Sequence, residues 1–346
     1  MLDDATILIT GGTGSLGQTL VRRLLRGEVG IPKKIIVYSR CEAKQYSMKS
    51  TWKHAHQATD DIYYDNFTEL LEFRIGDVRN YDSLKPAVAD SNVVINAAAM
   101  KQVPACEYFP AEAVATNVLG AENIVRAVRE APGVHTVLGV STDKACKPIN
   151  VMGMTKALQE RIFVEANVQQ SQCRFAAVRY GNVLSSRGSV IPLFKHQIAS
   201  GGPVTITMAE MTRFLLSLDH AVDTVFAALR SAIRGEVFVP RVPSARVTDI
   251  AAQMIGERDI ETVFTGIRPG EKIHEILVSE EEAFRTTERD GHYVILPHLP
   301  ELVGEECSRP LRGDYSSADA VIDGDALKAL LATADFIDPA MAEIER

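Results

Sequence analysis

The sequence predicts an α/β protein with a Rossmann-like, doubly wound parallel sheet and a smaller C-terminal α/β lobe. Over the first half of the chain, short apolar runs alternate with amphipathic helical stretches, and a glycine-rich turn follows the first run. After residue 180 this alternation loosens. We therefore expect a first domain over residues 1–180 that also takes in later segments, a second lobe over 181–300, and a terminal tail and helix over 301–346.

Composition excludes several classes of protein. The chain has 346 residues and a formal net charge of −8, which argues against general nucleic-acid binding. It shows neither a signal peptide nor an apolar run of the roughly 20 residues that cross a bilayer, so we expect a cytoplasmic protein without a membrane partner. The five cysteines lack CxxC spacing, which favours reduced thiols and no metal site.

The first predicted strand, residues 5–10, runs directly into a glycine-rich turn and then a helix over 18–25. Gly11 allows a tight turn, Gly14 lets backbone amides approach a pyrophosphate, and Gly17 allows close packing of helix on strand. The helix N-terminus adds amides and a partial positive charge. We therefore expect a dinucleotide to bind this turn, at Gly11, Thr13, Gly14, Ser15, Leu16 and Gly17.

The second predicted strand, residues 34–38, ends in Ser39 and Arg40, with Lys44 close behind. NAD sites usually carry an acidic residue at this strand end, whereas an arginine accommodates the 2′-phosphate of NADP. These residues favour NADP over NAD. The alternative is an ordinary surface arginine.

The third and fourth predicted strands, residues 71–75 and 93–99, each end in residues suited to the same cofactor. Asp77, followed by Val78, could accept a hydrogen bond from an adenine amino group, and it could also cap the helix that begins near Tyr81. Small residues at 97–99 (Ala97, Ala98 and Ala99) leave room for a ribose or nicotinamide. Lys101 then leads toward the substrate. Asn117 lies in a predicted helix over 110–130, with either a local hydrogen-bonding role or a solvent-facing one.

The fifth predicted strand, residues 136–140, ends in Ser141, Thr142, Asp143 and Lys144. Ligands of open α/β sheets bind beyond the carboxyl ends of the strands, so these side chains should project into the site. Pro148 prevents helix just before it, and a helix over 152–167 follows. Met152 and Lys156 are four residues apart and share one face of that helix.

Past the sixth predicted strand, residues 174–178, short extended pieces at 204–207, 238–240 and 262–264 suggest the smaller lobe. Arg213, Arg268 and Glu271 give that lobe anion-binding and hydroxyl-binding chemistry, because arginine forks suit phosphates and a carboxylate suits ribose hydroxyls. Each arginine alone is more often a surface charge. A terminal helix is expected over 325–333.

These motifs resemble those of the extended short-chain dehydrogenase/reductase superfamily, at residues 10–17, 76–78, 96–99, and Thr142 with Lys156. More narrowly, the chain resembles UDP-N-acetylglucosamine 4,6-dehydratases of capsule, O-antigen and flagellin-sugar biosynthesis. The motifs that carry this resemblance are residues 39–42, 98–104, 141–144, 179–184, 187–194, 211–214 and 268–272. Thr-Asp-Lys at 142–144 is the sharpest of them, since relatives acting on nucleotide-linked glucose carry Thr-Asp-Glu. Met152 stands at the usual catalytic tyrosine, as in some members of the group.

The resemblance implies a reaction in which hydride leaves sugar C4 for NADP⁺, the C5 proton is removed, water leaves from C6, and the hydride returns to C6. Asp143 would be the acid, with a pKa raised by burial, and Lys144 the base, with a pKa lowered by nearby cationic charge, although the neighbouring carboxylate opposes this. Lys156 would hold the nicotinamide ribose, Thr142 would bond the sugar O4, and Met152 would only pack. Further cofactor contacts are expected at Lys101 and Tyr180. The UDP-sugar would contact Lys101, Asn182, Ser189, Val190, Thr205, Arg213, Arg268 and Glu271.

The missing tyrosine leaves the O4 proton without its usual acceptor, because a thioether does not accept a proton usefully. Asp143, Lys144, or a water held by Thr142 and Lys156 could replace it. Two alternatives stay open: a UDP-N-acetylhexosamine 4-epimerase, which has no need of Asp143 and Lys144, and a non-catalytic NADP-binding protein. By resemblance a homo-oligomer, a dimer or hexamer, is also expected.

Overall fold

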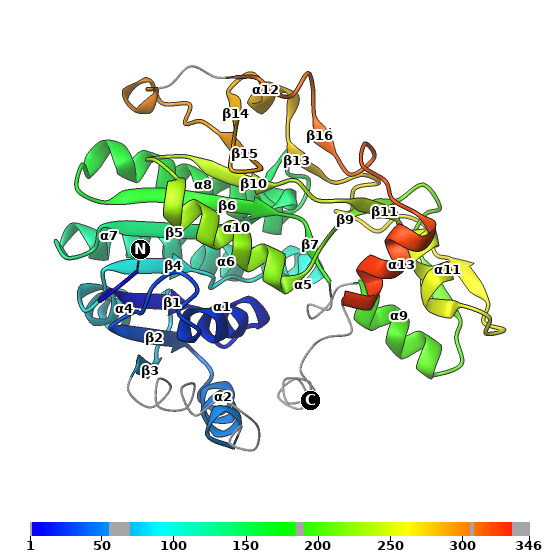
Figure 1. Cartoon of the computed structure of the whole chain (residues 1–346), viewed down its shortest axis with the longest axis horizontal. Coiled ribbons are helices and arrows are strands. Elements are labelled where there is room, and N and C mark those ends of the chain that lie inside the picture. The colour runs from blue at the N-terminus through cyan, green and yellow to red at the C-terminus, as the bar shows by residue number, and fades with distance from the viewer. Residues whose placement is uncertain (1, 55–69, 185–189, 305–307, 334–346) are drawn as a thin grey trace.

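A computed structural model of the chain describes residues 2–54, 70–184, 190–304 and 308–333 (Figure 1). Its centre is a nine-stranded sheet in the order β14-β15-β10-β6-β5-β4-β1-β2-β3. Seven neighbouring strands run parallel: β1 Thr6–Thr10, β2 Lys34–Ser39, β3 Leu71–Ile75, β4 Val93–Asn96, β5 Thr136–Thr142, β6 Arg174–Tyr180 and β10 Val237–Pro240. The order of the first six is that of a doubly wound dinucleotide-binding sheet, which confirms the predicted fold class.

An antiparallel hairpin completes the sheet on the β10 side. It consists of β14 (Thr286–Arg289) and β15 (His292–Ile295), and β15 pairs with β10. The sequence analysis did not predict this hairpin. It also placed residues 238–240 in the smaller lobe, whereas Val237 and Phe238 pair with Ala177 and Val178 of β6. The main sheet thus takes in later segments of the chain, and the domain limits at 180 and 300 stay a prediction.

Helices cover both faces of the sheet because its buried strands are apolar on both sides. On one face lie α4 (Tyr81–Ala89), α7 (Gly120–Arg129) and α8 (Val151–Gln169), over a core that includes Leu8, Val94 and Phe175. On the other face lie α1 (Ser15–Leu25) and α10 (Leu218–Ser231), over residues of the opposite parity such as Ile7 and Ile95. This alternation is the two-residue period of a strand.

The second lobe lies beyond the carboxyl ends of the parallel strands (Figure 1). Its own core is formed mainly by α9 (Val190–Ala199), α11 (Val247–Ile255) and α13 (Gly324–Thr333). Small sheets complete it: β7 (Asn182–Val183) with β9 (Thr212–Leu216) and β11 (Ser244–Arg246), and β8 (Val204–Ile206) with β12 (Thr262–Phe264). A further antiparallel pair joins the C-terminal tail to an earlier segment. It consists of β13 (Ile276–Val278) and β16 (Tyr315–Ser316).

Two predicted elements differ from the structure. The fourth strand ends at Asn96 and not at Ala99, because the chain turns there over the glycine-rich loop. The helix expected over 110–130 consists of α6 (Pro110–Ala113), a π-helical turn η1 (Val114–Leu119) and α7. A short helix α5 (Val103–Tyr108) precedes it. The π-turn holds Asn117 and shifts the helix by one residue next to the site.

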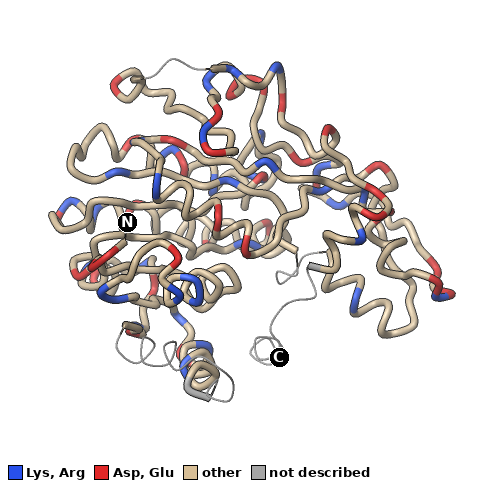
Figure 2. The backbone as a smooth tube through the Cα atoms, in the orientation of Figure 1, with Lys and Arg blue, Asp and Glu red and all other residues tan. Residues whose placement is uncertain are grey.

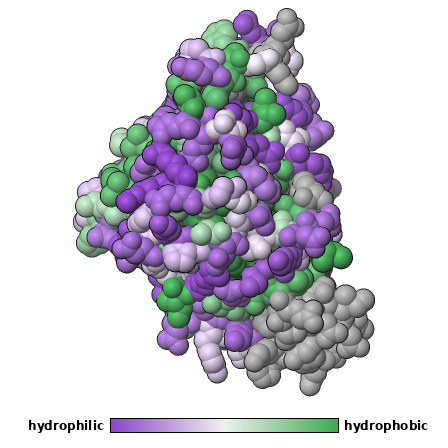
Figure 3. Space-filling view, turned by 90° about the vertical axis from the view of Figure 1, so that its left-hand side faces the viewer, coloured by the Kyte–Doolittle hydropathy of each residue, from purple (hydrophilic) through white to green (hydrophobic). Residues whose placement is uncertain are grey.

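Charged residues of both signs are interspersed along the chain (Figure 2). The end of the molecule opposite the second lobe is mostly hydrophilic, with hydrophobic residues scattered over it (Figure 3). Among the described helices, none is long and apolar enough to cross a membrane.

Candidate active site

The glycine-rich turn between β1 and α1 is open toward solvent at its centre. Gly11 has φ +67°, and a Cβ there would lie 2.8 Å from the carbonyl oxygen of Ala97. A Cβ on Gly17 would lie 2.5 Å from the carbonyl oxygen of Gly12. Gly14, at the N-cap of α1, is exposed, and no side chain bonds the cap. The N-terminus of α1 is therefore exposed at Gly14, where the helix dipole favours an anionic group.

Arg40 and Lys44 are exposed at the end of β2 and on α2 (Glu42–His54). The Arg40 Nη1 lies 3.8 Å from the Asp77 Oδ2. The Ser39 hydroxyl is instead buried and accepts a hydrogen bond from Gln45 Nε2 at 3.0 Å. The Ser39 side chain therefore faces the protein interior, and its role in cofactor binding stays a prediction.

Asp77 is held by Arg79, which donates from its backbone amide at 3.0 Å and from its side chain at 2.9 and 2.7 Å. Partial burial opposes ionisation, but these bonds hold the pKa of Asp77 below its ordinary value. The expectation that Asp77 caps the next helix was wrong. Asn80 is the N-cap of α4, and it accepts from the Ser83 amide at 3.1 Å because it stands directly before the helix.

Asn117 organises the loop that follows β4. Its Oδ1 accepts from the Met100 amide at 2.8 Å, and its Nδ2 donates to the Met100 carbonyl at 3.0 Å and to the Thr155 hydroxyl at 2.9 Å. It is fully buried, so the solvent-facing alternative is excluded. Thr155 lies on α8 between Met152 and Lys156. Asn117 therefore ties the expected cofactor loop, with Ala97, Ala98, Ala99 and exposed Lys101, to the helix that carries Lys156.

The end of β5 brings three of the predicted catalytic residues together. Asp143 is completely buried, and its Oδ1 accepts from the Thr142 hydroxyl at 2.8 Å and from Lys144 Nζ at 3.0 Å. Its Oδ2 is buried and has no hydrogen-bond partner among the described residues. One carboxylate oxygen is therefore held by protein and the other is left for a ligand or a proton.

Lys144 lies among oxygens of three different elements. Its Nζ is 3.0 Å from Asp143 Oδ1, 3.2 Å from Asn182 Oδ1 and 3.6 Å from Glu275 Oε1. Burial and Arg213 lower the pKa of Lys144, but the Asp143 and Glu275 carboxylates outweigh them and raise it above its ordinary value. The balance between cationic and carboxylate neighbours, which the sequence left open, thus favours a raised pKa of Lys144 in the chain without ligand, because Glu275 adds a second carboxylate.

Helix α8 begins at a double contact made by Asn150. Its Oδ1 caps the helix by accepting from the Gly153 amide at 2.8 Å, and its Nδ2 donates to the Gly270 carbonyl at 2.7 Å. A Cβ on Gly153 would lie 2.1 Å from the Lys144 carbonyl oxygen, so only glycine allows α8 to approach the Asp143 turn this closely. The turn formed by residues 268–272 is thereby held against the start of α8.

Met152 and Lys156 are both buried on α8. Met152 packs in an apolar cluster with Cys106 and Ala113, next to Met100 and Val103. Lys156 donates to Gln159 Oε1 at 2.7 Å, and burial lowers its pKa to about 8 in spite of Glu160. Tyr180 faces Thr142 across the β5–β6 pair, but burial raises its pKa, so it is a poor proton acceptor.

A buried ion network lies behind the site. The Arg179 guanidinium on β6 pairs with Glu160 of α8 at 2.6 Å and with Glu282 of α12 (Glu280–Ala283) at 2.7 Å. Ser141 also donates to Glu160, at 2.5 Å. Burial alone would raise the pKa of Glu282, but Arg179 lowers it to about 2. The network joins β6, α8 and α12.

The predicted substrate residues lie on the second lobe and the turns beside it. Arg213 is buried and donates to the carbonyls of Thr212 and Ile273 at 2.7 and 3.1 Å. Thr205 accepts from Gln197 Nε2 at 2.7 Å. Arg268 is exposed, and the Glu271 Oε2 is buried without a hydrogen-bond partner among the described residues. Val190 begins α9, and Ser189 lies outside the described residues.

Two residues of this site were missed from the sequence. Asn150 could have been found, since an asparagine directly before a predicted helix is a common N-cap. Glu275 gave no local indication, because it meets Lys144 only through the fold. In the part of the chain that the structure describes, no group of three or more His, Cys, Asp or Glu residues is placed to hold a metal ion.

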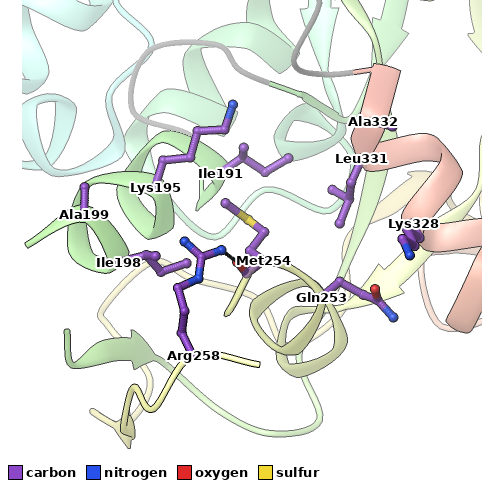
Figure 4. Close-up of a pocket in the computed structure, with 10 residues that line it drawn as sticks. All are labelled: Ile191, Lys195, Ile198, Ala199, Gln253, Met254, Arg258, Lys328, Leu331 and Ala332. Carbon is purple, nitrogen blue, oxygen red and sulfur yellow. Dashed lines mark hydrogen bonds between the residues drawn. The ribbon is translucent and has the colours of Figure 1, made fainter. Parts of the chain in front are cut away.

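A cavity of about 410 Å³ lies away from Asp143, between α9, α11 and α13 (Figure 4). Its walls include Ile191, Ile198 and Met254, and none of the predicted site residues lines it. Arg258 at its rim donates to the carbonyls of Ile255 and Met254, so it serves the C-terminal end of α11. This cavity belongs to the packing of the second lobe.

The chain resembles known proteins over most of its length. The sequence profile of a polysaccharide biosynthesis protein family matches residues 7–297. A UDP-N-acetylglucosamine 4,6-dehydratase (inverting) of Campylobacter jejuni is 40% identical, over 94% of this chain and 92% of that protein. A protein of Rickettsia typhi named UDP-glucose 4-epimerase is 39% identical, over 97% of this chain and 98% of its own.

Solved structures show the same fold. Pen from Bacillus thuringiensis has a TM-score of 0.85 at 32% identity, covering 96% of this chain and 99% of Pen. DesIV, a dTDP-glucose 4,6-dehydratase from Streptomyces venezuelae solved with NAD, has a TM-score of 0.64 at 19% identity, covering 78% and 86%. From the family match and these relatives, we conclude that the chain belongs to the polysaccharide biosynthesis protein family.

Proposed function

We propose that this protein is an NADP-dependent UDP-N-acetylglucosamine 4,6-dehydratase. The observation that carries the proposal is the pairing of buried Asp143 with Lys144 at the end of β5, with one Asp143 oxygen left unpartnered. A dehydration needs an acid for the departing C6 oxygen and a base for the C5 proton. A 4-epimerase needs neither. The Campylobacter jejuni relative of that name supports the same choice.

The residues around the glycine-rich turn fit a nicotinamide dinucleotide. A Cβ at Gly14 would lie 3.3 Å from the Gly11 carbonyl oxygen, so glycine allows this tight turn and leaves the N-terminus of α1 open to a pyrophosphate. Arg40 and Lys44 would meet the 2′-phosphate, which favours NADP. Asp77 with Val78 would flank the adenine, and Lys156 would hold the nicotinamide ribose. When bound, the cofactor accepts hydride from sugar C4 and supplies it to C6.

Asp143 provides a route for the O4 proton that does not need a tyrosine. Its Oδ2 takes the proton from O4 while C4 is oxidised, and the same proton is later delivered to O6 as water leaves. One carboxylate thus serves first as base and then as acid, and its proton count is restored. Complete burial and the unpartnered Oδ2 support this role. Thr142 would assist by turning its hydroxyl from Asp143 Oδ1 to the sugar O4.

Lys144 is the proposed base for the C5 proton, which becomes acidic once C4 is a ketone. It takes this proton as a neutral amine, its ammonium exchanges protons with solvent, and it protonates C5 after hydride has reached C6. In the absence of ligand its ammonium is stabilised by Asp143 and Glu275. Protonation of Asp143 by the O4 proton removes one of these charges, so the first half-reaction prepares the second.

The diphosphate and ribose of the substrate would bind the second lobe. Arg213 and Arg268 supply guanidinium groups for phosphate, and Glu271 supplies a carboxylate oxygen for ribose hydroxyls. Asn150 fixes the carbonyl of Gly270 in this turn, so the substrate turn is held next to α8.

The four described cysteines are free thiols, which supports a cytoplasmic location.

A homodimer is part of the proposal. Val114 and Leu119 of η1 and Met154 and Leu158 of α8 are exposed apolar residues on neighbouring elements. Such residues on adjacent helices are typical of an interface between subunits. Light scattering of Leu158→Glu beside the unchanged protein tests this, with a shift from dimer to monomer as the expected result.

A UDP-sugar 4-epimerase is the second candidate, because the Rickettsia typhi relative carries that name at similar identity. Proton NMR of UDP-N-acetylglucosamine with the protein and NADP⁺ in D₂O separates the two. The dehydratase yields a new C6 methyl signal with deuterium at C5. A galacto-configured product that keeps its C6 hydroxyl would make the protein an epimerase and refute the proposal.

A further inference from the structure

Glu275 is a buried carboxylate at the centre of the site that the reaction described above does not use. Glu275 is only 3% exposed, and it lies between the turn formed by residues 268–272 and the start of β13. Its backbone is fixed from the tail: its amide donates to the Ser317 hydroxyl at 2.9 Å, and its carbonyl accepts from the Ser317 amide at 2.8 Å. The backbone of Glu275 is therefore fixed by one segment that lies 42 residues later in the chain.

The carboxylate lies between two cations. Its Oε1 is 3.6 Å from Lys144 Nζ and 3.9 Å from Arg213 Nε. Its Oε2 is buried and has no hydrogen-bond partner among the described residues. Burying such a group is costly unless its charge is compensated, so Glu275 contributes to the site through these cations.

Lys144 Nζ has two hydrogen-bond acceptors and one further carboxylate beside it. It donates to Asp143 Oδ1 at 3.0 Å and to Asn182 Oδ1 at 3.2 Å, and Glu275 Oε1 lies 3.6 Å away, at ion-pair distance. Two of these three oxygens belong to carboxylates, which attract an ammonium and not a neutral amine. The arrangement therefore favours the charged form, which the two hydrogen bonds orient.

We propose that Glu275 is a positioning residue that holds the Lys144 ammonium in place and sets the pH above which Lys144 becomes available as a base. The role of Lys144 as a base rests on the proposed dehydratase function. The effect of Glu275 on the Lys144 ammonium does not depend on that function. The charged groups that face Lys144 are Asp143 beside it, Glu275 before β13, and Arg213 on β9.

Removing the charge of Glu275 has a distinctive consequence. In Glu275→Gln the amide keeps the shape and an acceptor oxygen, but Lys144 loses one of two neighbouring carboxylates while Arg213 remains. The pKa of Lys144 should therefore fall, by roughly one unit or more for the loss of a charge at this distance. The base becomes available at lower pH, whereas its poorer orientation lowers the maximal rate.

The pKa of Lys144 is measured directly by ¹³Cε NMR titration of lysine-labelled protein, with Lys144→Arg to assign the signal. In parallel, the rate of deuterium incorporation at C5 is followed against pH. We expect both the titration and the rising limb of the rate to move to lower pH in Glu275→Gln. Glu280→Gln on the exposed part of α12 is the matched control and should move neither.

Unchanged midpoints in a folded Glu275→Gln protein, with only a lower maximal rate, would overturn the proposal and leave Glu275 a structural residue. Circular dichroism and UDP binding establish that the variant is folded. Glu275→Asp serves as a second variant, because it restores the charge and should return both midpoints toward those of the unchanged protein. If the unchanged protein makes no C6 methyl product, the proposed function fails, yet the titration still tests Glu275.

Discussion

Asn117 brackets the backbone of Met100, accepting its amide at 2.8 Å and donating to its carbonyl at 3.0 Å. Asn117→Ala removes both partners at once. We expect a loss of about 2 kcal/mol in the free energy of unfolding, since unsatisfied backbone groups cost about 1–3 kcal/mol each when buried. Turnover should fall as well, because the loop after β4 and Thr155 on α8 lose their link. Denaturant unfolding and steady-state kinetics measure the two effects.

Asn92→Ala provides the matched control for this prediction. Asn92 also bonds two backbone groups, the Thr6 amide at 2.9 Å and the Gly133 carbonyl at 3.2 Å, but at the other end of the strands. It should lower stability and leave the turnover number unchanged. Equal losses of turnover in both variants would show that Asn117 acts through stability alone.

Met152 should contribute packing and no proton transfer. Met152→Ala is expected to lower stability by about 2–5 kcal/mol, as for other large-to-small changes in a core, because Met152 is only 7% exposed. The rate of C4 oxidation per folded active site should fall less than tenfold, well below the 10²–10⁴-fold typical of a lost acid–base group. Met152→Leu, which keeps the volume, is the control. Destroyed activity with intact substrate binding would contradict this passive role.

Arg40 should select the phosphorylated cofactor. Arg40→Glu removes an exposed guanidinium at the end of β2 and places a carboxylate where NAD-binding chains carry one. The ratio of NADP to NAD affinity should fall by about two orders of magnitude, as expected for losing a phosphate–arginine contact and gaining repulsion. Calorimetric titration of cofactor-free protein with each dinucleotide gives the ratio. Glu42→Gln, two residues away at the start of α2, should change it little.

Lys156 should lower the stability of the cofactor-free protein. Burial lowers its pKa from 10.5 to about 8, so between these values the unfolded chain binds more protons and stability rises with pH. At pH 7 the penalty amounts to about 3 kcal/mol at most. Lys156→Met should therefore unfold at a higher temperature at pH 7, and this advantage should shrink as pH approaches 10. Scanning calorimetry at several pH values tests it, with exposed Lys49→Met as the control.

Much of the first domain could be predicted because its signals are local. The apolar runs at 34–38 and 71–75 and the Gly11–Gly14–Gly17 turn each depend on a few neighbouring residues. The β14 strand is polar and both strands of the hairpin have only four residues, so their strand pattern is weak, and the place of the hairpin beside β10 depends on the whole sheet. Asp77 was mistaken for a cap because Asn80, three residues later, competes for the same role.

The candidate site divides in the same way. Asp143, Lys144 and Lys156 follow from one continuous stretch, and their placement at the end of β5 and on α8 was predictable. The charge state of Lys144 was not, because it depends on Glu275, which is distant in sequence and meets it only after folding. Electrostatic balance at a site is set by neighbours in space, and sequence spacing gives little information about them.

The contact between Ser317 and Glu275 also bears on how this protein could be shortened or recombined. Ser317 lies beyond residue 297, where the family profile stops matching. Its hydroxyl nevertheless accepts a hydrogen bond from the Glu275 amide and forms another with the Thr212 hydroxyl at 2.7 Å. A chain cut after residue 300, or a hybrid whose tail lacks Ser317, would keep every motif named in the sequence analysis and would lose the hydrogen bonds that fix the Glu275 backbone. Such hybrids should differ first in the pH range over which they work.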